Sequence, residues 1–121
     1  MPARFTELAI DCLDTARVAD FWAAVLGYQV LARDADGTIA IGAAPDAYPA
    51  LVFAPVPERK SLKNRVHIDI NPVGTDQAAE LQRLLGLGAR PVDVGQGEVS
   101  WVVLADPEGN EFCLLRRTLG D

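Results

Sequence analysis

The amino-acid sequence predicts an α+β fold made of two βαβββ modules, with mostly antiparallel sheet, helices on one face and a shared cleft. The first observation is a repeat. Glu7 and His67, like Phe53 and Cys113, are separated by 60 residues and occupy matching positions in the two halves. The second is that each half runs from a strand through an amphipathic helix with a Leu-Gly stop into further strands, without strict alternation of strands and helices. A repeated unit of this kind usually buries its apolar face against its copy.

The first module, residues 1–56, is expected to contain four strands, at residues 4–12, 28–33, 38–42 and 51–54. Its first strand alternates polar and apolar residues, which indicates one buried face. Asp14 is a suitable N-cap for the helix that follows, and Gly27 ends that helix. Trp22 lies at helical spacing with its apolar neighbours and is interpreted as core. Asp36-Gly37 predicts a tight hairpin between the second and third strands.

The second module, residues 66–121, is expected to contain strands at residues 66–71, 89–93, 99–105 and 111–116. Thr75 or Asp76 caps a helix, Gly86 and Gly88 end it, and its core face is Ala78, Leu81, Leu84 and Leu85. Residues 106–109 fit a type I turn, with Asp first, Pro second and Gly fourth. Residues 55–65 hold two prolines and several basic residues, among them Lys60 and Lys63. They predict an exposed connection between the modules.

The composition limits the partners. A chain of 121 residues with 50% hydrophobic and 23% charged residues is expected to form a single domain, residues 1–121. The formal net charge of −6 argues against a nucleic acid or an anionic membrane as partner. No apolar run is long enough to span a bilayer, and the first residues lead into a strand rather than a signal peptide. A cytoplasmic location is therefore expected.

Strand periodicity sorts the side chains between two faces, because successive residues of a strand point in opposite directions. The residues expected to face the helices are Leu8, Ile10, Val66, Ile68 and Ile70. Those expected to face the other way are Glu7, Ala9, Asp11, His67, Asp69 and Asn71. The second set is too polar for a dry core and predicts a wet cleft. Cys12 belongs to the first set and Cys113 to the second, so two thiols are expected rather than a disulfide.

Several short motifs resemble a known family over nearly the whole chain. They are Cys12-Leu13-Asp14, Asp20-Phe21-Trp22, Val25-Leu26-Gly27-Tyr28, His67-Ile68-Asp69, Leu87-Gly88-Ala89 and the segment Val103 to Cys113. In this order and spacing the chain is similar to the glyoxalase/bleomycin-resistance/dioxygenase group, the vicinal oxygen chelate superfamily, and most of all to its glyoxalase-like subgroup. The resemblance implies a U-shaped, mixed eight-stranded sheet around a central cleft, with helices outside. It also implies a homodimer.

The resemblance further implies a metal position. Metal-using members hold one divalent ion with ligands from the first and last strands of each module, which correspond here to Glu7, Phe53, His67 and Cys113. Phe53 cannot ligate, and a Cys113 thiolate would favour zinc over magnesium or manganese. The residues that the resemblance leaves as metal ligands are Glu7 and His67, and the cofactor it implies, if there is one, is zinc, nickel or manganese.

The same two residues are the predicted catalytic pair, and each has a second interpretation. Neutral imidazole is the commonest protein metal ligand, but the favoured interpretation of His67 is a hydrogen bond to Glu7 or Asp69 without an ion, because the ligand set is incomplete. Glu7 fits a general base, because a carboxylate without a partner in a cleft is suited to accept a proton, or else an ion pair.

Five further residues are predicted to contact a ligand: Asp11, Phe53, Asp69, Trp101 and Cys113. Phe53 and Trp101 would wall an apolar pocket for a ring-bearing molecule. Asp69 either orients His67 or, as the favoured interpretation, bonds neighbouring backbone. Cys113 is interpreted as a small buried residue rather than a reactive thiol, because no basic residue adjoins it in sequence.

Two functions follow. The first is an enzyme that acts on a small oxygenated substrate such as an α-hydroxycarbonyl, of the lyase, isomerase or dioxygenase type, using Glu7, His67 and a metal. The second is a non-catalytic protein that sequesters a drug or metabolite, as bleomycin-resistance proteins do. Lactoylglutathione lyase activity is disfavoured, since Phe53 and Cys113 break the ligand set.

Overall fold

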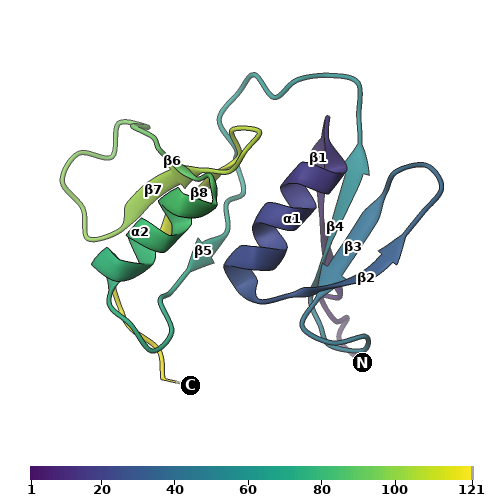
Figure 1. Ribbon diagram of the computed structural model, residues 1–121, viewed down its shortest axis with the longest axis horizontal. Coiled ribbons are helices and arrows are strands. Elements are labelled where there is room, and N and C mark those ends of the chain that lie inside the picture. The colour runs from purple at the N-terminus through teal and green to yellow at the C-terminus, as the bar shows by residue number, and fades with distance from the viewer. Residues whose placement is uncertain (121) are drawn as a thin grey trace. The chain divides into compact units, whose positions relative to one another are not determined.

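The computed structural model describes residues 1–120 and divides the chain into two compact units, Met1–Arg59 and Lys60–Asp121 (Figure 1). The boundary lies inside the predicted connection, residues 55–65. Each unit contains one helix and one four-stranded sheet in the order βαβββ. This confirms the predicted α+β class and the duplicated module. The two sheets have the same strand order, first-fourth-third-second, so the repeat in the sequence is a repeat in topology.

The first unit contains β1 Glu7–Cys12, α1 Thr15–Leu26, β2 Gln29–Arg33, β3 Ile39–Gly42 and β4 Ala50–Pro55. β1 and β4 pair in parallel, while β3 pairs antiparallel with both β2 and β4. Burial alternates along β1 as predicted, with Leu8 and Ile10 partly buried and Glu7 and Asp11 exposed. The predicted hairpin joins β2 to β3, and Gly37 takes the positive φ that its turn requires.

Helix α1 forms where the sequence predicts it. The Asp14 carboxylate accepts a hydrogen bond from the Arg17 backbone N–H at 3.1 Å, and Gly27 adopts the left-handed conformation that ends the helix. Its buried face is Val18, Ala19, Phe21, Trp22 and Val25, and it packs on β3 and β4. Trp22 is therefore core, as predicted.

The second unit contains β5 Asp69–Ile70, α2 Gln77–Leu87, β6 Arg90–Pro91, β7 Val102–Ala105 and β8 Glu111–Leu114. β5 pairs in parallel with β8, and β7 pairs antiparallel with β6 and β8. The Asp106–Gly109 turn joins β7 to β8, with the Gly109 N–H donating to the Asp106 carbonyl at 2.9 Å. All four of these strands are shorter than predicted.

The prediction that Val66 faces the helix is wrong, since Val66 is 73% exposed. The physical reason is the length of its partner strand. Asp69 pairs with Cys113, so Val66 lies level with Asn110, which is already in the turn before β8. No ladder continues there to hold Val66 against the sheet.

Helix α2 is capped by Asp76, one of the two predicted caps, whose carboxylate accepts from the Ala79 N–H at 2.8 Å. Leu84 is fully buried, whereas Ala78, predicted for the same face, is exposed. Gly88 ends the helix in the left-handed region, but Gly86 lies within it, which corrects the prediction that both glycines end it.

The register of the two parallel pairs differs by one residue, and this corrects the predicted position of Phe53. In the first unit Ala9 pairs with Val52, and in the second Asp69 pairs with Cys113. Val52 and Cys113 are separated by 61 residues rather than 60, so the counterpart of Cys113 is Val52. Phe53 instead pairs with Ile10, is 0% exposed and belongs to the core of the first unit. A one-residue shift turns a strand side chain to the opposite face.

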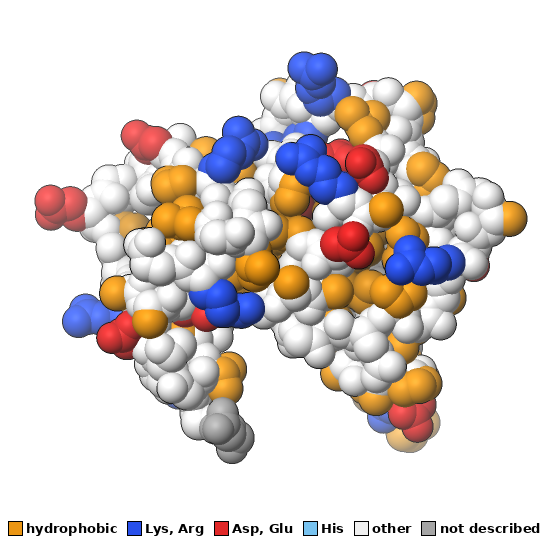
Figure 2. All heavy atoms as spheres, in the orientation of Figure 1, with side chains coloured by type: hydrophobic (Ala, Val, Ile, Leu, Met, Phe, Trp, Pro, Cys, Tyr) orange, Lys and Arg blue, Asp and Glu red, His pale blue; other side chains and the backbone are white. Residues whose placement is uncertain are grey.

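Surface and membrane features are simple. Figure 2 shows Lys and Arg side chains scattered among Asp and Glu side chains on the face that it presents. Within residues 1–120, neither helix has the length and apolar character needed to cross a bilayer. Both cysteines are thiols, and both are buried.

Candidate functional site

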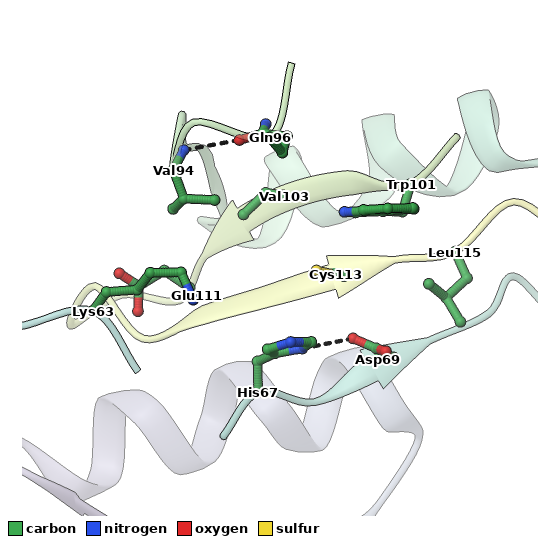
Figure 3. A pocket seen from close by; sticks show the side chains of 10 residues that line it. All are labelled: Lys63, His67, Asp69, Val94, Gln96, Trp101, Val103, Glu111, Cys113 and Leu115. Carbon is green, nitrogen blue, oxygen red and sulfur yellow. Dashed lines mark hydrogen bonds and ion pairs between the residues drawn. The ribbon is translucent and has the colours of Figure 1, made fainter. Parts of the chain in front are cut away.

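A pocket of about 320 Å³ opens on one face of the sheet in the second unit (Figure 3). The pocket is lined by alternate residues of three neighbouring strands, because every second residue of a strand points to the same face. Positions 67 and 69 come from β5 and the residues before it, 101 and 103 from β7 and its approach, and 111, 113 and 115 from β8 and its end. The full lining is Lys63, His67, Asp69, Val94, Gln96, Trp101, Val103, Glu111, Cys113 and Leu115.

His67 and Asp69 form a hydrogen-bonded pair in this pocket, with His67 Nδ1 and Asp69 Oδ1 2.8 Å apart. An ionised carboxylate can only accept, so the imidazole Nδ1–H donates and Nε2 is left to contact a ligand. The favoured interpretation of Asp69, a bond to neighbouring backbone, is thereby corrected. The alternative interpretation, in which Asp69 orients the His67 ring, agrees with this hydrogen bond. Both side chains are about two-fifths exposed, at 42% and 43%, so the pair is accessible from the pocket.

Cys113 lies beside this pair because it is the direct partner of Asp69 across the parallel β5–β8 ladder. It is 8% exposed. Burial raises the pKa of the Cys113 thiol, and the negative charge and hydrogen bonding of Asp69 raise it further, against a smaller opposite effect of Lys63. The thiol is therefore protonated at neutral pH and is a poor nucleophile. Donor atoms of His67, Asp69 and Cys113 all lie within 4.8 Å of one another.

The rest of the wall is largely apolar. Trp101 lines the pocket and is 41% exposed, and Val94, Val103 and Leu115 contribute aliphatic surface. Figure 3 shows the Trp101 ring and the His67 ring on opposite sides of β8, whose Cys113 lies between them. This arrangement suits a molecule with an apolar body and one oxygen- or nitrogen-bearing group.

A charged cluster closes one end of the pocket. The Glu111 carboxylate, 12% exposed, accepts from Lys60 Nζ at 3.0 Å and from the Asn64 backbone N–H at 2.9 Å. Burial raises the pKa of Glu111, but the Asn64 and Lys60 hydrogen bonds outweigh it and hold that pKa below the ordinary 4.5. We call Lys60, Asn64 and Glu111 the clasp, because they tie the start of the second unit to β8. Lys63, next to Asn64, also lines the pocket.

Sequence reasoning did not identify Glu111, Val94 or Gln96 as lining residues. Glu111 carried a usable signal, because it lies two residues before Cys113 on the same strand and so shares its face. Val94 and Gln96 come from the irregular segment between β6 and β7, where no periodicity orders the side chains.

Glu7, Asp11 and Phe53 lie in the first unit, outside this pocket. Glu7 and Asp11 are exposed on the β1 face opposite the core. Their predicted roles, including the pairing of Glu7 with His67, stay predictions. Phe53 belongs to the core of the first unit, so the prediction that it contacts a ligand is wrong.

Comparison with known proteins shows the family. The family model described as "Glyoxalase-like domain" matches residues 7–115, which span both units. No curated protein gives a significant match. Among solved structures, the fosfomycin resistance protein FosX from Mesorhizobium loti is similar over 98% of this chain and 95% of its own, with a TM-score of 0.73 and 14% identity.

Two other solved structures have the same fold. FosX from Listeria monocytogenes, in a mutant form complexed with Mn(II) and a dihydroxypropylphosphonic acid, matches 95% of this chain and 90% of its own, with a TM-score of 0.67 and 12% identity. A glyoxalase/bleomycin resistance protein/dioxygenase family enzyme from Burkholderia phytofirmans matches 93% and 97%, with a TM-score of 0.65 and 17% identity. These identities show likeness of fold, and the family model shows membership: the chain belongs to the glyoxalase-like domain family.

Proposed function

We propose that the protein binds a small organic molecule in the pocket of the second unit and acts on an oxygen-bearing group of that molecule through His67. The observation that carries the proposal is the His67–Asp69 pair at 2.8 Å, which opens onto a wall that contains Trp101. A cavity of about 320 Å³ is within the size range of small-molecule sites. Trp101 and the aliphatic residues would bind the apolar body, and His67 would contact the polar group.

The proposed action of His67 is proton transfer. Imidazole exchanges protons near neutral pH, and a base of this kind must be held in one orientation to act. The bond from Nδ1 to Asp69, drawn in Figure 3, supports such a role, since it orients the ring and leaves Nε2 for contact with a ligand. The α-hydroxycarbonyl class of substrate stays part of the proposal, because the proton next to a carbonyl is one that a base of this strength can remove with assistance.

We also propose a divalent metal, zinc, nickel or manganese, held by Glu7 and His67. The exposed carboxylate of Glu7 and the Nε2 of His67 are suitable donors, and the Asp69 bond is the kind of support that metal-binding histidines have. The FosX structure that contains Mn(II) supports a metal in this fold. A bound ion would polarise a substrate oxygen. Glu7 would then serve as the second proton-transfer group.

The proposal is tested by ligand capture. The purified protein is incubated with a small-molecule extract, washed and analysed by mass spectrometry, in parallel with Trp101→Ala and His67→Ala. Wild type should retain and convert a compound, Trp101→Ala should bind it at least about tenfold more weakly, and His67→Ala should bind it without converting it. A His67→Ala protein that converts every captured compound at the wild-type rate would overturn the role of His67.

The metal part has its own test. Elemental analysis after mild purification should give about one zinc, nickel or manganese per chain, and the ion should be lost in both Glu7→Gln and His67→Ala. Asp11→Asn, on the same strand face as Glu7, is the matched control and should keep the ion. A metal-free protein, or a metal content that neither variant changes, rejects this part alone.

A non-catalytic role as a drug- or metabolite-sequestering protein is the second candidate. The apolar lining around Trp101 favours this candidate. The Cys113 thiol favours it as well, because it is protonated and stands where metal-using relatives are expected to carry a metal ligand. Recovery of a tightly bound compound in unaltered form from wild type supports this candidate. Turnover of that compound rejects it.

Two proposals concern the whole molecule: a homodimer, which the family resemblance supports, and the cytoplasmic location that the sequence features led us to expect. Light scattering coupled to size-exclusion chromatography should give twice the chain mass of 13.0 kDa. Fractionation of the native cells should place the protein with cytoplasmic markers. A monomer at micromolar concentration, or recovery in another fraction, would reject the respective proposal.

A further inference from the structure

We infer that the pocket of the second unit selects molecules that carry a carboxylate, and that Lys63 is the residue that binds this group. The inference rests on the proposed function and deepens it, since it names the class of molecule that the pocket accepts. The observation that carries it is a difference among the charged side chains of the lining. Each carboxylate there has a partner in the protein, whereas Lys63 forms no ion pair within residues 1–120.

The carboxylates of the pocket are already engaged by neighbouring side chains. Glu111 pairs with Lys60, whose Nζ lies 3.0 Å from a carboxylate oxygen. Asp69 accepts a hydrogen bond from His67 Nδ1 at 2.8 Å. Lys60 and Glu111 thus neutralise each other at one end of the pocket. The charge that a ligand meets there without a counter-charge is the ammonium of Lys63.

The Lys63 ammonium also has hydrogen-bond donors to spare. An ammonium group carries three N–H donors. Within the described residues it makes one hydrogen bond, to the Asn64 carbonyl at 3.2 Å, and that acceptor is neutral. The other N–H groups are left for a ligand. A carboxylate is a strong acceptor for them, because a hydrogen bond between charged groups is roughly twice as strong as one between neutral groups.

The backbone on both sides of Lys63 is held in place by the clasp. Lys60 Nζ donates to the Leu62 carbonyl at 2.6 Å while it pairs with Glu111. On the other side, the Asn64 N–H donates to Glu111 at 2.9 Å. The residues directly before and after Lys63 are therefore tied to β8. A side chain presented from a fixed backbone costs less to order when a ligand binds.

The charge of Lys63 acts on the middle of the pocket. Burial raises the pKa of the Cys113 thiol and Asp69 raises it further, whereas Lys63 acts in the opposite direction. A positive charge favours the thiolate in this way only when it lies nearby.

The pocket therefore has a charged end and an apolar end. Figure 3 shows Lys63 and Glu111 at one end, Trp101 and Leu115 at the other, and His67 between them. A molecule that uses the whole pocket places its carboxylate at Lys63 and its apolar body against Trp101. Its oxygen-bearing carbon then lies near His67. This order of groups describes a small 2-hydroxy or 2-oxo acid with an aromatic or aliphatic tail. A single cation balances a single negative charge, which favours a carboxylate over a doubly charged phosphate ester.

The test compares acids with their neutral amides. The probes are 3-phenylpropanoate, its 2-hydroxy and 2-oxo derivatives and the primary amide of each, which has nearly the same shape without the charge. Dissociation constants are measured on the full-length protein by NMR titration. Wild type should bind each acid about five- to tenfold more tightly than its amide. The preference should decrease in about 0.5 M salt, because salt screens an accessible charge.

Three variants assign the preference to Lys63. Lys63→Met removes the ammonium from a side chain of similar length and should bind acid and amide alike. Lys63→Arg restores a cation and should restore the preference. Arg65→Met is the matched control, since Arg65 is an exposed basic residue of the same connection that does not line the pocket. It changes the net charge as Lys63→Met does and should keep the preference.

Each outcome decides the inference. Equal affinity of wild type for acid and amide, or a preference that survives in Lys63→Met, overturns it. A preference lost equally in Arg65→Met also overturns it, because the charge of the whole surface then explains the effect.

Trp101→Ala separates this inference from the proposed function. If acids and amides bind wild type equally and Trp101→Ala weakens both, the pocket stands and only the role of Lys63 fails. If neither acids nor amides bind wild type, the pocket itself fails, and the proposed function is rejected together with the inference.

Discussion

Replacing Glu111 with glutamine is expected to loosen the clasp that ties the start of the second unit to its sheet. Glu111 accepts from Lys60 Nζ at 3.0 Å and from the Asn64 backbone N–H at 2.9 Å, and its side chain is only 12% exposed. Glutamine keeps an oxygen that can accept from Asn64 but loses the charge that pairs with Lys60. The substitution therefore isolates the ionic part of the contact.

The size of the effect follows from the burial of the two groups. A hydrogen bond to a charged partner contributes about 1.5–3 kcal/mol. Lys60 is 21% exposed, so water and salt screen part of this, and a loss of about 1–2 kcal/mol in the free energy of unfolding is expected. A double-mutant cycle with Lys60→Met should give a coupling of about 1 kcal/mol, because both single variants break the same contact.

The pH dependence has a definite sign. Burial alone would raise the pKa of Glu111, but its hydrogen bonds with Asn64 and Lys60 hold that pKa below the ordinary 4.5. A carboxyl with a depressed pKa in the folded state contributes stability that is present above the ordinary pKa and is lost as the pH falls through the folded-state pKa. The difference between wild type and Glu111→Gln should be constant near neutral pH and shrink below about pH 4.5.

Urea unfolding followed by circular dichroism at about pH 7 and about pH 3.5 measures this difference. Glu98→Gln, an exposed glutamate of the same unit, is the control and should change stability by less than about 0.5 kcal/mol. The reasoning is refuted if Glu111→Gln and Glu98→Gln behave alike, or if the deficit of Glu111→Gln grows as the pH falls.

Three further predictions concern stability and are checked by the same unfolding measurement. Asp106→Ala should cost about 2–4 kcal/mol, because this fully buried carboxylate accepts two backbone and two side-chain hydrogen bonds in its turn; a near-neutral effect would contradict that account. Gly27→Ala should cost about 1–2 kcal/mol, because φ is +68° there, whereas Gly86→Ala, inside α2 with open space around it, should gain about 0.5–1 kcal/mol. Phe53→Ala should cost about 3–5 kcal/mol and Trp101→Ala less than about 1 kcal/mol, since the first is fully buried and the second 41% exposed; equal costs would contradict the assignment of Phe53 to the core.

Features that depend on a few neighbouring residues were predictable from the sequence. Asp14 and Gly27 delimit α1, Asp76 and Gly88 delimit α2, and the Asp106 turn lies where its residue types require. Caps and turns are satisfied by hydrogen bonds within one turn of chain, so their signals are local. The alternation that directs His67 and Asp69 to one face is local for the same reason.

The register between distant strands was not predictable from the repeat. Counting 60 residues placed Phe53 opposite Cys113 and into a cleft, whereas the hydrogen-bonded ladder makes Val52 the counterpart and buries Phe53 beside Ile10. The halves differ by a single residue in loop length, and an apolar segment such as Leu51 to Ala54 does not reveal this difference. Either set of alternate side chains in that segment could face the core. Burial of the larger side chain decides the face.

The grouping at the pocket likewise belongs to the tertiary structure. Asp69 meets Cys113 only because β5 and β8, far apart in the chain, pair in one register, and Lys60 reaches Glu111 only because the connection folds back onto β8. The residue types of these groups were visible in the sequence and indicated polar chemistry. Their distances were not, because contacts between remote segments are set by which strands pair and which side chains the core accepts, and no local rule encodes either.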